Sequence, residues 1–507
     1  MSLRLYNSRT RTVEPFVPLE PGRIRIYVCG LTPSAEAHLG HARSFIFFDV
    51  VRRYLVHLGY RVDFVRNVTD IDDRSIHAAL ERGVPFTDII EGFFKSFQHS
   101  MSRLHVLEPD HEPRATQYIG EIVAMIAALV ERGNAYVVGD GVYFSVASFK
   151  NYGELSGRNV EELLIGARIA PGEEKRDPLD FALWKFAKPG EPSWTSPWGD
   201  GRPGWHIECS AMSHALLGEP FDIHGGGFDL IFPHHENEIA QSESLFGPPL
   251  VNVWMHGGLL LFEGKKMSKS LGNFEPLSAL LERHDPQAIR MSFLYSGYRK
   301  PMNFTEESLE GATSALRRLF AAYDELRAEP AGPPASEVER AALESYRTRF
   351  FEALDDDFNT SVAVAALRDL ANGSSDPARV GGASAAAAFM HEALGLLGLS
   401  PSERAHAAVA TKSVTTRAIG DREYRIERRQ EEHLPPDAVE RLRNLVGEVV
   451  PLGDLESPAA VDAVVLARFA AKSAKDFALA DRFRKALEET GVSIADSKDG
   501  ATWTAGV

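Results

Sequence analysis

The chain has 507 residues, of which 44% are hydrophobic and 25% are charged, as in an ordinary soluble globular protein. Single hydrophobic cores stop growing near ~250–300 residues, so we expect several domains. The net charge of -16 argues against a general nucleic-acid coating protein but does not exclude a local basic surface. No apolar run approaches the ~18 residues of a membrane span, and residues 1–18 lack the apolar core of a signal peptide. We therefore expect a cytoplasmic protein with no membrane partner.

The first elements predict a parallel sheet. Residues 23–30 (RIRIYVCG) alternate apolar and polar side chains, which is typical of a strand. Residues 38–58 carry apolar side chains at helical spacing, and residues 61–70 predict a second strand. Strand, helix and strand in this order form a βαβ unit. The expected fold class is therefore α/β, with a Rossmann-like nucleotide-binding domain.

The later segments predict an insertion and two further domains. A helix followed by short strands is expected over residues 115–150, and a stretch rich in Gly, Pro and charge follows it. Nearly everything from residue 306 to residue 399 is helical in pattern, and the remainder is mixed and charged. The expected boundaries are two halves of the nucleotide-binding domain at 1–114 and 201–250, a connective insertion at 115–200, a loop-bearing region at 251–305, a helical bundle at 306–405 and a small mixed C-terminal domain at 406–507.

A His-Leu-Gly-His sequence lies where the first strand turns into the first helix. A helix N-terminus offers backbone N–H groups and the positive end of its dipole to a phosphate. Gly40 permits close backbone approach, and His38 and His41 can donate hydrogen bonds to phosphate oxygens. Taken alone, the motif is equally consistent with two surface histidines.

A second candidate phosphate motif, KMSKS, occupies residues 266–270. Lys266 and Lys269, with Ser268 between them on a glycine-flanked loop, can neutralise a pyrophosphate leaving group as its charge develops. In isolation, a basic surface loop would explain these residues. In this order and context, however, HLGH and KMSKS together resemble the signature of class I aminoacyl-tRNA synthetases, which is far more specific than either motif.

The chain contains two cysteines, Cys29 and Cys209. A reducing cytoplasm argues against a disulfide, and two unrelated buried thiols would be the ordinary interpretation. Cys29 ends the first predicted strand, and Cys209 lies in a segment (GWHIECSAMSHAL) that is expected to begin a helix after residue 204. The local contexts of both cysteines make a metal site the better hypothesis.

Further ligands come from the segment FPHHENE. A helix that starts at Pro233 would place His234 and Glu238 one turn apart on one face. Two thiolates, one imidazole and one carboxylate suit zinc. His235 also lies within a turn of Glu238, so spacing does not choose between the two histidines, and a plain helix cap is the alternative interpretation.

Over nearly its full length the chain resembles the cysteinyl-tRNA synthetases. The segments that carry the resemblance are YVCG, HLGHAR, NVTDIDD, KRDPLDFALWKFAKPGEPSW, GRPGWHIECSAM, DIHGGGFDLIFPHHENEIAQSE, WMHGG and KMSKSLGN. The resemblance implies one zinc ion per chain with four protein ligands, completed by the substrate thiolate: Cys29, Cys209, His234 and Glu238. It also implies a cysteine-binding site formed by Gly30, Thr32, Thr69, Trp205 and Asp229.

The implied activity is ATP-dependent activation of L-cysteine to cysteinyl adenylate, followed by transfer to the 3′-terminal adenosine of tRNA(Cys). Magnesium would accompany ATP, with no all-protein magnesium cage visible. A hydrophobic pocket separates near-isosteres by only ~1–3 kcal/mol, whereas zinc prefers a thiolate strongly over a hydroxyl, which removes the need for an editing domain. ATP binding is assigned to both motifs, whose histidines and lysines would be catalytic: His38, Gly40, His41, Lys266, Ser268 and Lys269. We expect a monomer.

The resemblance also assigns roles to the later domains. It makes 251–305 a stem-contact region, 306–405 a tRNA-binding bundle and 406–507 an anticodon-binding region. Within the last region, the basic residues between 412 and 429 could meet RNA phosphates or form a solvated surface. Trp503 could stack on an anticodon base or pack the small domain.

The chain departs from the family pattern at several positions. The loop at 33–37 reads PSAEA where a Tyr-Asp pair is common, and Gly297 stands where a histidine is usual. The sequence RSIH at 74–77 replaces a lysine-flanked pair that is linked to a persulfide side activity, and the tail lacks the usual arginine. The carboxylates of Asp70, Asp72 and Asp73 are interpreted as a helix N-cap, not as a metal site.

Two alternative functions remain open at this point. One is the related ligase that joins cysteine to an amino-sugar in mycothiol synthesis, which lacks a tRNA-binding end. The other is a non-catalytic paralogue that binds zinc or RNA. The helical region after residue 306 argues against the ligase, and intact phosphate motifs argue against the paralogue.

Overall fold

The computed structural model describes residues 3–159, 174–266, 275–329, 336–374, 380–401, 412–419, 422–429, 436–446, 449–450, 459–497 and 500–505. The chain divides into two compact units, Met1–Ser402 and Glu403–Val507. In the part that the structure describes, no helix has the length and apolar character of a membrane span.

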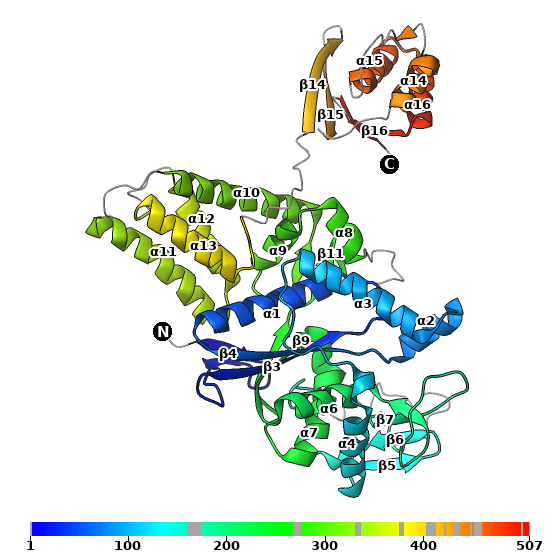
Figure 1. Ribbon diagram of the computed structural model, residues 1–507, viewed down its shortest axis with the longest axis vertical. Helices are drawn as coiled ribbons and strands as arrows, with labels where there is room; N and C mark the ends of the chain where they lie inside the picture. Colours follow the sequence, from blue (N-terminus) through cyan, green and yellow to red (C-terminus); the bar gives the residue numbers. More distant parts are fainter. Residues whose placement is uncertain are drawn as a thin grey trace. The chain divides into compact units, whose positions relative to one another are not determined.

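The first unit is built on a four-stranded parallel sheet with the strand order β10-β9-β3-β4. Its strands are β3 (Arg23–Leu31), β4 (Arg61–Val68), β9 (Phe221–Gly227) and β10 (Val251–Gly257). Helix α1 (Leu39–His57) covers one face, and α6 (Trp205–Leu217) and α7 (Glu236–Phe246) lie on the other (Figure 1). The predicted α/β fold is confirmed. The sheet extends past residue 250, where its second half was expected to end.

Both faces of the sheet are covered, which explains why its strands are almost continuously buried. Because all four strands are parallel, their carboxyl ends lie at one edge, where open α/β sheets bind ligands. This edge carries Cys29 and Gly30 on β3, Gly227 on β9 and Gly257 on β10. The sheet therefore brings residues from the first and the second half of the nucleotide-binding domain to one edge.

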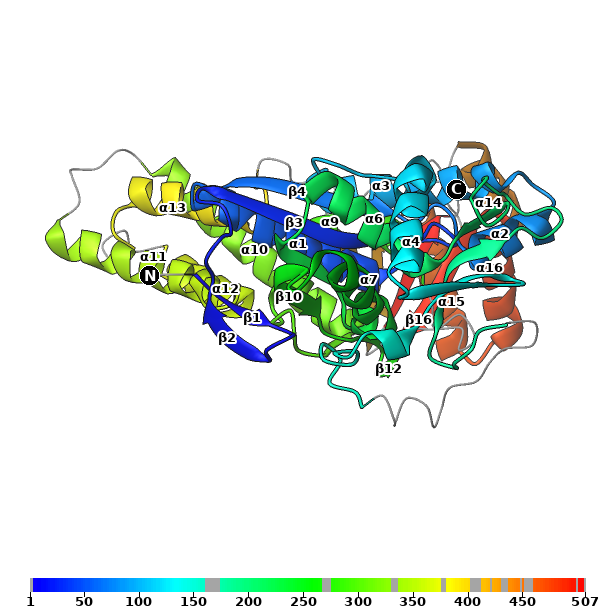
Figure 2. The same ribbon diagram turned by 90° about the horizontal axis from the view of Figure 1, so that it is seen from below.

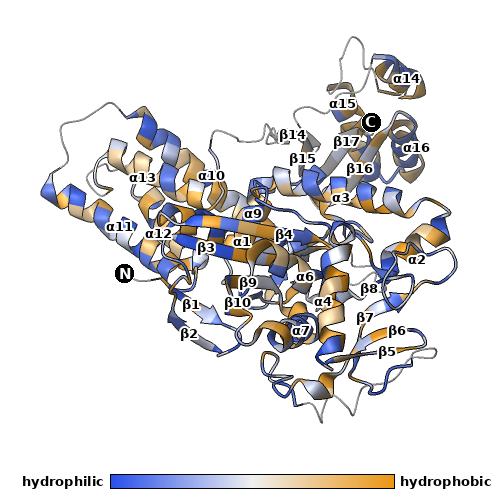
Figure 3. Ribbon diagram, turned by 60° about the horizontal axis from the view of Figure 1, so that its bottom comes forward, coloured by the Kyte–Doolittle hydropathy of each residue, from blue (hydrophilic) through white to orange (hydrophobic). Residues whose placement is uncertain are grey.

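A long segment, which includes the expected insertion at 115–200, separates β4 from α6. It contains α2 (Asp73–Arg82), α3 (Phe86–Arg103), α4 (Ile119–Glu131) and an antiparallel sheet of β5 (Ala135–Val138), β6 (Gly141–Phe144), β7 (Phe181–Phe186) and β8 (Gly201–Pro203). Helix α4 is mainly hydrophobic (Figure 3) and packs with this sheet around the fully buried Trp184. Asp72 caps α2 by accepting a hydrogen bond from the Arg74 amide at 2.8 Å, so its interpretation as an N-cap is confirmed.

Smaller elements surround the sheet. Strands β1 (Arg4–Asn7) and β2 (Thr12–Pro15) form a hairpin (Figure 2). A three-stranded sheet follows β10 and is formed by β11 (Leu260–Phe262), β12 (Lys265–Lys266) and β13 (Met302–Phe304). The described residues between β12 and β13 form two helices, α8 (Leu277–Arg283) and α9 (Pro286–Leu294).

The rest of the first unit is the predicted helical bundle. It consists of α10 (Glu306–Ala328), α11 (Glu337–Asp355), α12 (Thr360–Asn372) and α13 (Ala383–Leu396). Capping boxes begin α10 and α11, where Thr305 pairs with Ser308 and Ser336 with Glu339. The apolar side chains of the bundle belong to the same hydrophobic core as those of α1.

The second unit has its own core. A sheet of strand order β14-β15-β17-β16 is formed by β14 (Lys412–Ile419), β15 (Arg422–Arg429), β16 (Val492–Ser497) and β17 (Gly500–Ala505). Its helices are α14 (Pro436–Val446), α15 (Ala459–Ser473) and α16 (Phe477–Glu489). Trp503 is 0% exposed, and its indole Nε1 donates to Asp462 at 2.7 Å. Base stacking by Trp503 is therefore wrong, and core packing is correct.

Candidate active site

A cavity of about 800 Å³ opens at the carboxyl edge of the parallel sheet. All five residues that were predicted to bind cysteine line it: Gly30, Thr32, Thr69, Trp205 and Asp229. His38, Gly40 and His41 line the same cavity, as do Cys29, Cys209 and His234. The candidate phosphate site and the candidate metal site therefore share one space.

The HLGH motif forms the N-terminus of α1. His38 is the N-cap, and its Nδ1 accepts a hydrogen bond from the Gly40 amide at 3.0 Å. His41 Nδ1 accepts from the His38 amide at 3.2 Å, and the two rings stack with centroids 3.9 Å apart. Because each Nδ1 accepts, a neutral ring carries its proton on Nε2.

The electrostatics of this helix end favour neutral imidazole. Burial, with the nearby His38, lowers the pKa of His41 to about 3. His41 is therefore a neutral hydrogen-bond donor at physiological pH. The positive charge expected near a polyphosphate must come from the helix dipole and from arginine or lysine side chains.

The second phosphate motif is described only at its first residue. Lys266 ends strand β12, and its backbone pairs with Leu261 of β11. Ser268 and Lys269 lie outside the described residues. Their assignment to ATP stays a prediction, as does the role of the Lys266 side chain.

The candidate metal ligands converge although they come from separate elements: β3, α6, the Ile231–His235 turn and α7. The Sγ atoms of Cys29 and Cys209 lie 3.8 Å apart, and Cys29 Sγ lies 3.7 Å from Glu238 Oε1. His234 Nε2 lies 3.1 Å from the same Glu238 oxygen. All four ligand atoms lie within 4.8 Å of one another, and all four side chains are buried.

These distances fit a tetrahedral zinc ion. Zinc–sulfur bonds of ~2.3 Å in a tetrahedron place two sulfurs about 3.8 Å apart. Burial, with Cys209 and Glu238 beside it, raises the pKa of the Cys29 thiol well above its usual range. A thiolate is therefore costly here unless a cation balances it. Burial also lowers the pKa of His234 well below its usual range, which keeps the imidazole in its metal-binding neutral form.

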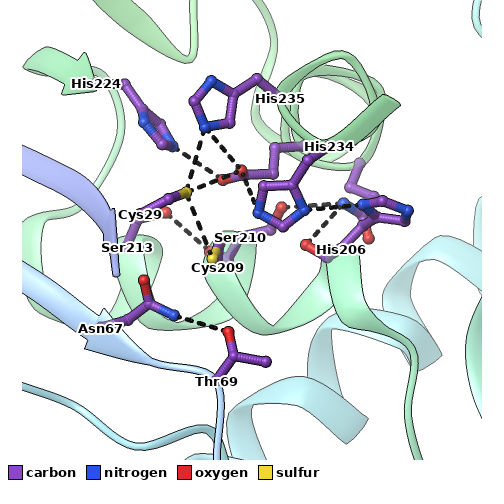
Figure 4. A network of polar contacts seen from close by, with 12 residues as sticks. Cys29, Asn67, Thr69, His206, Cys209, Ser210, Ser213, His224, His234 and His235 are labelled. Carbon is purple, nitrogen blue, oxygen red and sulfur yellow. Dashed lines mark hydrogen bonds and ion pairs between the residues drawn. The ribbon is translucent and has the colours of Figure 1, made fainter. Parts of the chain in front are cut away.

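A second set of four ligands overlaps the first. Cys29 and Glu238 also lie within reach of His224 and His235, with His235 Nε2 3.2 Å from Cys29 Sγ and His224 Nε2 2.9 Å from Glu238 Oε2. Figure 4 shows these imidazoles pointing toward the Cys29 thiol and the carboxylate beside it. His224 and His235 do not line the cavity, whereas His234 does. A substrate in the cavity would therefore reach the first set.

A helix starts at Pro233, just before the histidine pair, as the sequence predicted. Within Ile231–His235 the residue with non-helical backbone is Phe232 (φ -139°, ψ 129°), so helical backbone starts at Pro233 and runs into α7 (Glu236–Phe246). A residue before proline is pushed away from the helical region, which accounts for the extended Phe232. His234 and Glu238 therefore lie one turn apart on one face, with His234 Nε2 3.1 Å from Glu238 Oε1.

Several surrounding groups were missed in the sequence. His206 Nδ1 lies 2.9 Å from His234 Nδ1, and His235 Nδ1 lies 2.7 Å from His256 Nε2. These contacts orient both candidate histidines, as second partners of metal-binding imidazoles commonly do. His206 lies three residues before Cys209, which was a signal in the sequence, whereas His256 in WMHGG is far from both cysteines in the chain.

Asn67 on β4 also lines the cavity and forms hydrogen bonds with two of its neighbours there. The Asn67 side chain accepts from the Gly30 amide at 2.8 Å and donates to Thr69 Oγ1 at 3.2 Å. A Cβ on Gly30 would lie 1.6 Å from the Asn67 carbonyl oxygen, so only glycine fits. Trp205 stacks on His234 with ring centroids 4.3 Å apart. One asparagine thus positions two of the predicted cysteine-binding residues.

The positions that depart from the family pattern also reach this cavity. Ser34 and Ala35 line it, and so do Arg74 and His77 of α2. Gly297 lies outside the lining, but its carbonyl oxygen accepts a hydrogen bond from Arg43 at 3.5 Å.

The comparisons with known proteins agree with this geometry. The family model described as "tRNA synthetases class I (C) catalytic domain" matches residues 15–314, and the DALR domain model matches residues 349–400. A curated protein named cysteine–tRNA ligase from Alkalilimnicola ehrlichii is 46% identical, with 99% of both chains covered. A protein of the same name from Thioalkalivibrio sulfidiphilus is 47% identical, with 99% of this chain and 100% of the relative covered. The chain belongs to the cysteine–tRNA ligase family of class I aminoacyl-tRNA synthetases.

Solved structures support the same fold. Mycobacterium tuberculosis methionyl-tRNA synthetase in complex with methionyl-adenylate aligns with a TM-score of 0.57 at 17% identity, covering 77% of this chain and 96% of that one. Thermus thermophilus arginyl-tRNA synthetase aligns with a TM-score of 0.50 at 15% identity, covering 76% and 83%. At these identities the likeness concerns the fold alone. Membership of the family confirms the expectation of a class I synthetase enzyme.

Proposed function

We propose that the chain activates L-cysteine with ATP and transfers the cysteinyl group to the 3′-terminal adenosine of tRNA(Cys). The carboxylate of cysteine attacks the α-phosphorus of ATP, which yields cysteinyl adenylate and releases pyrophosphate. The ribose hydroxyl of the terminal adenosine then attacks the activated carbonyl and releases AMP. The observation that carries this proposal is the single cavity that holds both the two-cysteine ligand set and the HLGH helix end.

Cys29, Cys209, His234 and Glu238 would hold the zinc ion. Zinc supplies a soft Lewis acid that accepts a thiolate far more readily than a hydroxyl, which separates cysteine from serine. Trp205 stacks on His234 and lines this end of the cavity. Thr69 and Asp229 line the adjoining wall, where the amino and carboxylate groups of cysteine would lie.

The HLGH end of α1 would act on the nucleotide. Neutral His41 donates its Nε2 proton to a phosphate oxygen, and the amides at the start of α1 add the positive end of the helix dipole. Such groups work by positioning ATP and stabilising charge in the displacement. Lys266 and Lys269, with magnesium, would balance the charge on the leaving pyrophosphate.

The relatives that match over 99% of the chain favour tRNA as the acceptor over an amino-sugar. The DALR match within the helical bundle supports this choice, because a cysteine–amino-sugar ligase has no need of a tRNA-binding region. A non-catalytic paralogue would not need the phosphate cavity and the ligand set together.

Cysteine-dependent ATP–pyrophosphate exchange, followed by aminoacylation of tRNA(Cys), tests the proposal. We expect both activities, with exchange supported by cysteine and not by serine. Exchange without charging of tRNA would identify the amino-sugar ligase. Zinc binding with neither activity would identify the non-catalytic paralogue.

A further inference from the structure

One buried cation in the cavity wall has no part in the chemistry described above. Arg43 follows the HLGH motif on α1, is 6% exposed and lines the cavity. Among the described residues, no carboxylate lies within ion-pair distance of its guanidinium, and burial lowers its pKa to about 10. Burying an unbalanced charge is costly, so its retention calls for an explanation.

Within the part of the chain that the structure describes, all hydrogen bonds of the guanidinium go to backbone carbonyl oxygens. Nη1 donates to Gly258 at 2.9 Å and to Leu259 at 3.0 Å. Nη2 donates to Lys300 at 2.5 Å and to Tyr298 at 3.3 Å. A single side chain of α1 therefore joins two loops that are separate in sequence.

Both loops lead into the sheet that precedes the KMSKS motif. Gly258 and Leu259 connect β10 to β11, and β11 pairs with β12, which ends at Lys266. Backbone contacts bring the loops close, since the Gly258 amide donates to the Tyr298 carbonyl at 2.7 Å. A Cβ on Gly258 would lie 2.5 Å from the Arg299 carbonyl oxygen, so this approach requires glycine.

A second buried arginine, Arg290, serves as a comparison, because its charge is balanced within the protein. Arg290 on α9 is 0% exposed and donates to the carbonyls of Leu397, Leu104 and His105. It differs from Arg43 in two respects: it forms an ion pair with Asp49, and it does not line the cavity. The contrast indicates that Arg43 is balanced by something that enters the cavity.

We propose that Arg43 is a positioning residue for ATP: it holds the segment leading to KMSKS against the HLGH helix end, and bound polyphosphate balances its charge. The inference rests on the proposed function and deepens it. The planar guanidinium of Arg43 suits this task, because a lysine ammonium cannot donate hydrogen bonds to two loops in the same fixed geometry. The ligand whose phosphates balance the charge of Arg43 is a nucleoside triphosphate.

The test compares Arg43→Gln and Arg43→Lys with Arg290→Gln. Hydrogen bonds to charged groups are worth ~1.5–3 kcal/mol, which corresponds to a loss of roughly 10- to 150-fold. We expect Arg43→Gln to lower kcat/KM for ATP in pyrophosphate exchange within this range, with Arg43→Lys intermediate. Zinc content and cysteine KM should stay at wild-type values. Arg290→Gln should lower the melting temperature and leave the KM for ATP unchanged.

Thermal stabilisation by an ATP analogue tests the role of Arg43 separately from the proposed function. Binding of α,β-methylene-ATP should raise the melting temperature of the wild type and of Arg290→Gln, and raise that of the Arg43 variants less. If wild-type exchange fails but the analogue still distinguishes Arg43, the proposed function is wrong and this inference stands. Wild-type ATP kinetics in a folded Arg43 variant, or an equal loss of ATP affinity in Arg290→Gln, would overturn the inference. If Arg43→Gln does not fold, Arg43→Lys decides by the same criteria.

Discussion

The Sγ atoms of Cys29 and Cys209 lie 3.8 Å apart although 180 residues separate them in the chain. Cys29 lies two residues before the end of β3, and Cys209 lies one turn into α6, which packs on the same sheet. The pair faces the cavity that also holds the HLGH helix end. The thiol specificity of the proposed reaction thus depends on how one helix docks on one strand.

Replacing Cys209 tests the ligand set directly. We expect Cys209→Ser to lower zinc content well below one equivalent per chain and to raise the KM for cysteine, because a serine hydroxyl is a poor zinc ligand. Elemental analysis and pyrophosphate exchange measure the two effects. Ser213→Ala, a buried change one turn along the same helix, is the matched control and should keep its zinc. Full zinc content in Cys209→Ser would contradict the assignment.

The two adjacent histidines can be separated in the same way. His234 Nε2 lies 3.1 Å from Glu238, and His235 Nε2 lies 3.2 Å from Cys29. Since His234 belongs to the cavity-facing set, we expect His234→Asn to lose zinc to a chelator much faster than His235→Asn. Competition with a colorimetric chelator measures the rates. Faster zinc loss from His235→Asn than from His234→Asn would indicate that zinc binds the set containing His224 and His235 instead.

Stability should fall as the pH falls below ~6.5, the ordinary pKa of histidine. Burial lowers the pKa of His41 to about 3, so between pH 6.5 and pH 3 the unfolded chain binds a proton that the folded chain does not. Each such histidine contributes a loss of ~1.4 kcal/mol per pH unit. Urea unfolding of the first unit at pH 7 and pH 5.5 measures this loss. His41→Gln should show a shallower dependence, and an unchanged slope would contradict the lowered pKa.

Trp503 should stabilise the second unit and should not contact RNA directly. We expect Trp503→Ala to cost ~3–5 kcal/mol of that unit's stability, because it removes a fully buried ring and its hydrogen bond to Asp462. Trp503→Phe should cost less. Denaturant unfolding followed by circular dichroism measures both variants, and Phe477→Ala, at a ring that is 64% exposed, serves as the control. Normal stability combined with weak tRNA binding would restore the stacking interpretation.

Local pattern accounts for much of the fold. The alternation in residues 23–30 and the helical spacing after residue 38 correspond to β3 and α1, because burial on a strand or a helix imposes its own period. The helix start at Pro233 also follows from local pattern, since a proline is favoured in a first turn and makes the residue before it extended, as an N-cap residue is.

The sequence by itself determined the residue types of the site: two cysteines, a histidine–glutamate spacing and a helix start suited to phosphate. Their convergence was decided by the parallel sheet, which gathers the carboxyl ends of β3, β9 and β10 at one edge. Only the tertiary structure revealed His206 beside His234, Asn67 beneath Gly30 and Arg43 bridging two loops. These contacts join residues distant in the chain, and no local periodicity encodes such distances. Composition and motifs thus predicted which chemical groups the site contains, whereas the packing of the elements set the distances between them.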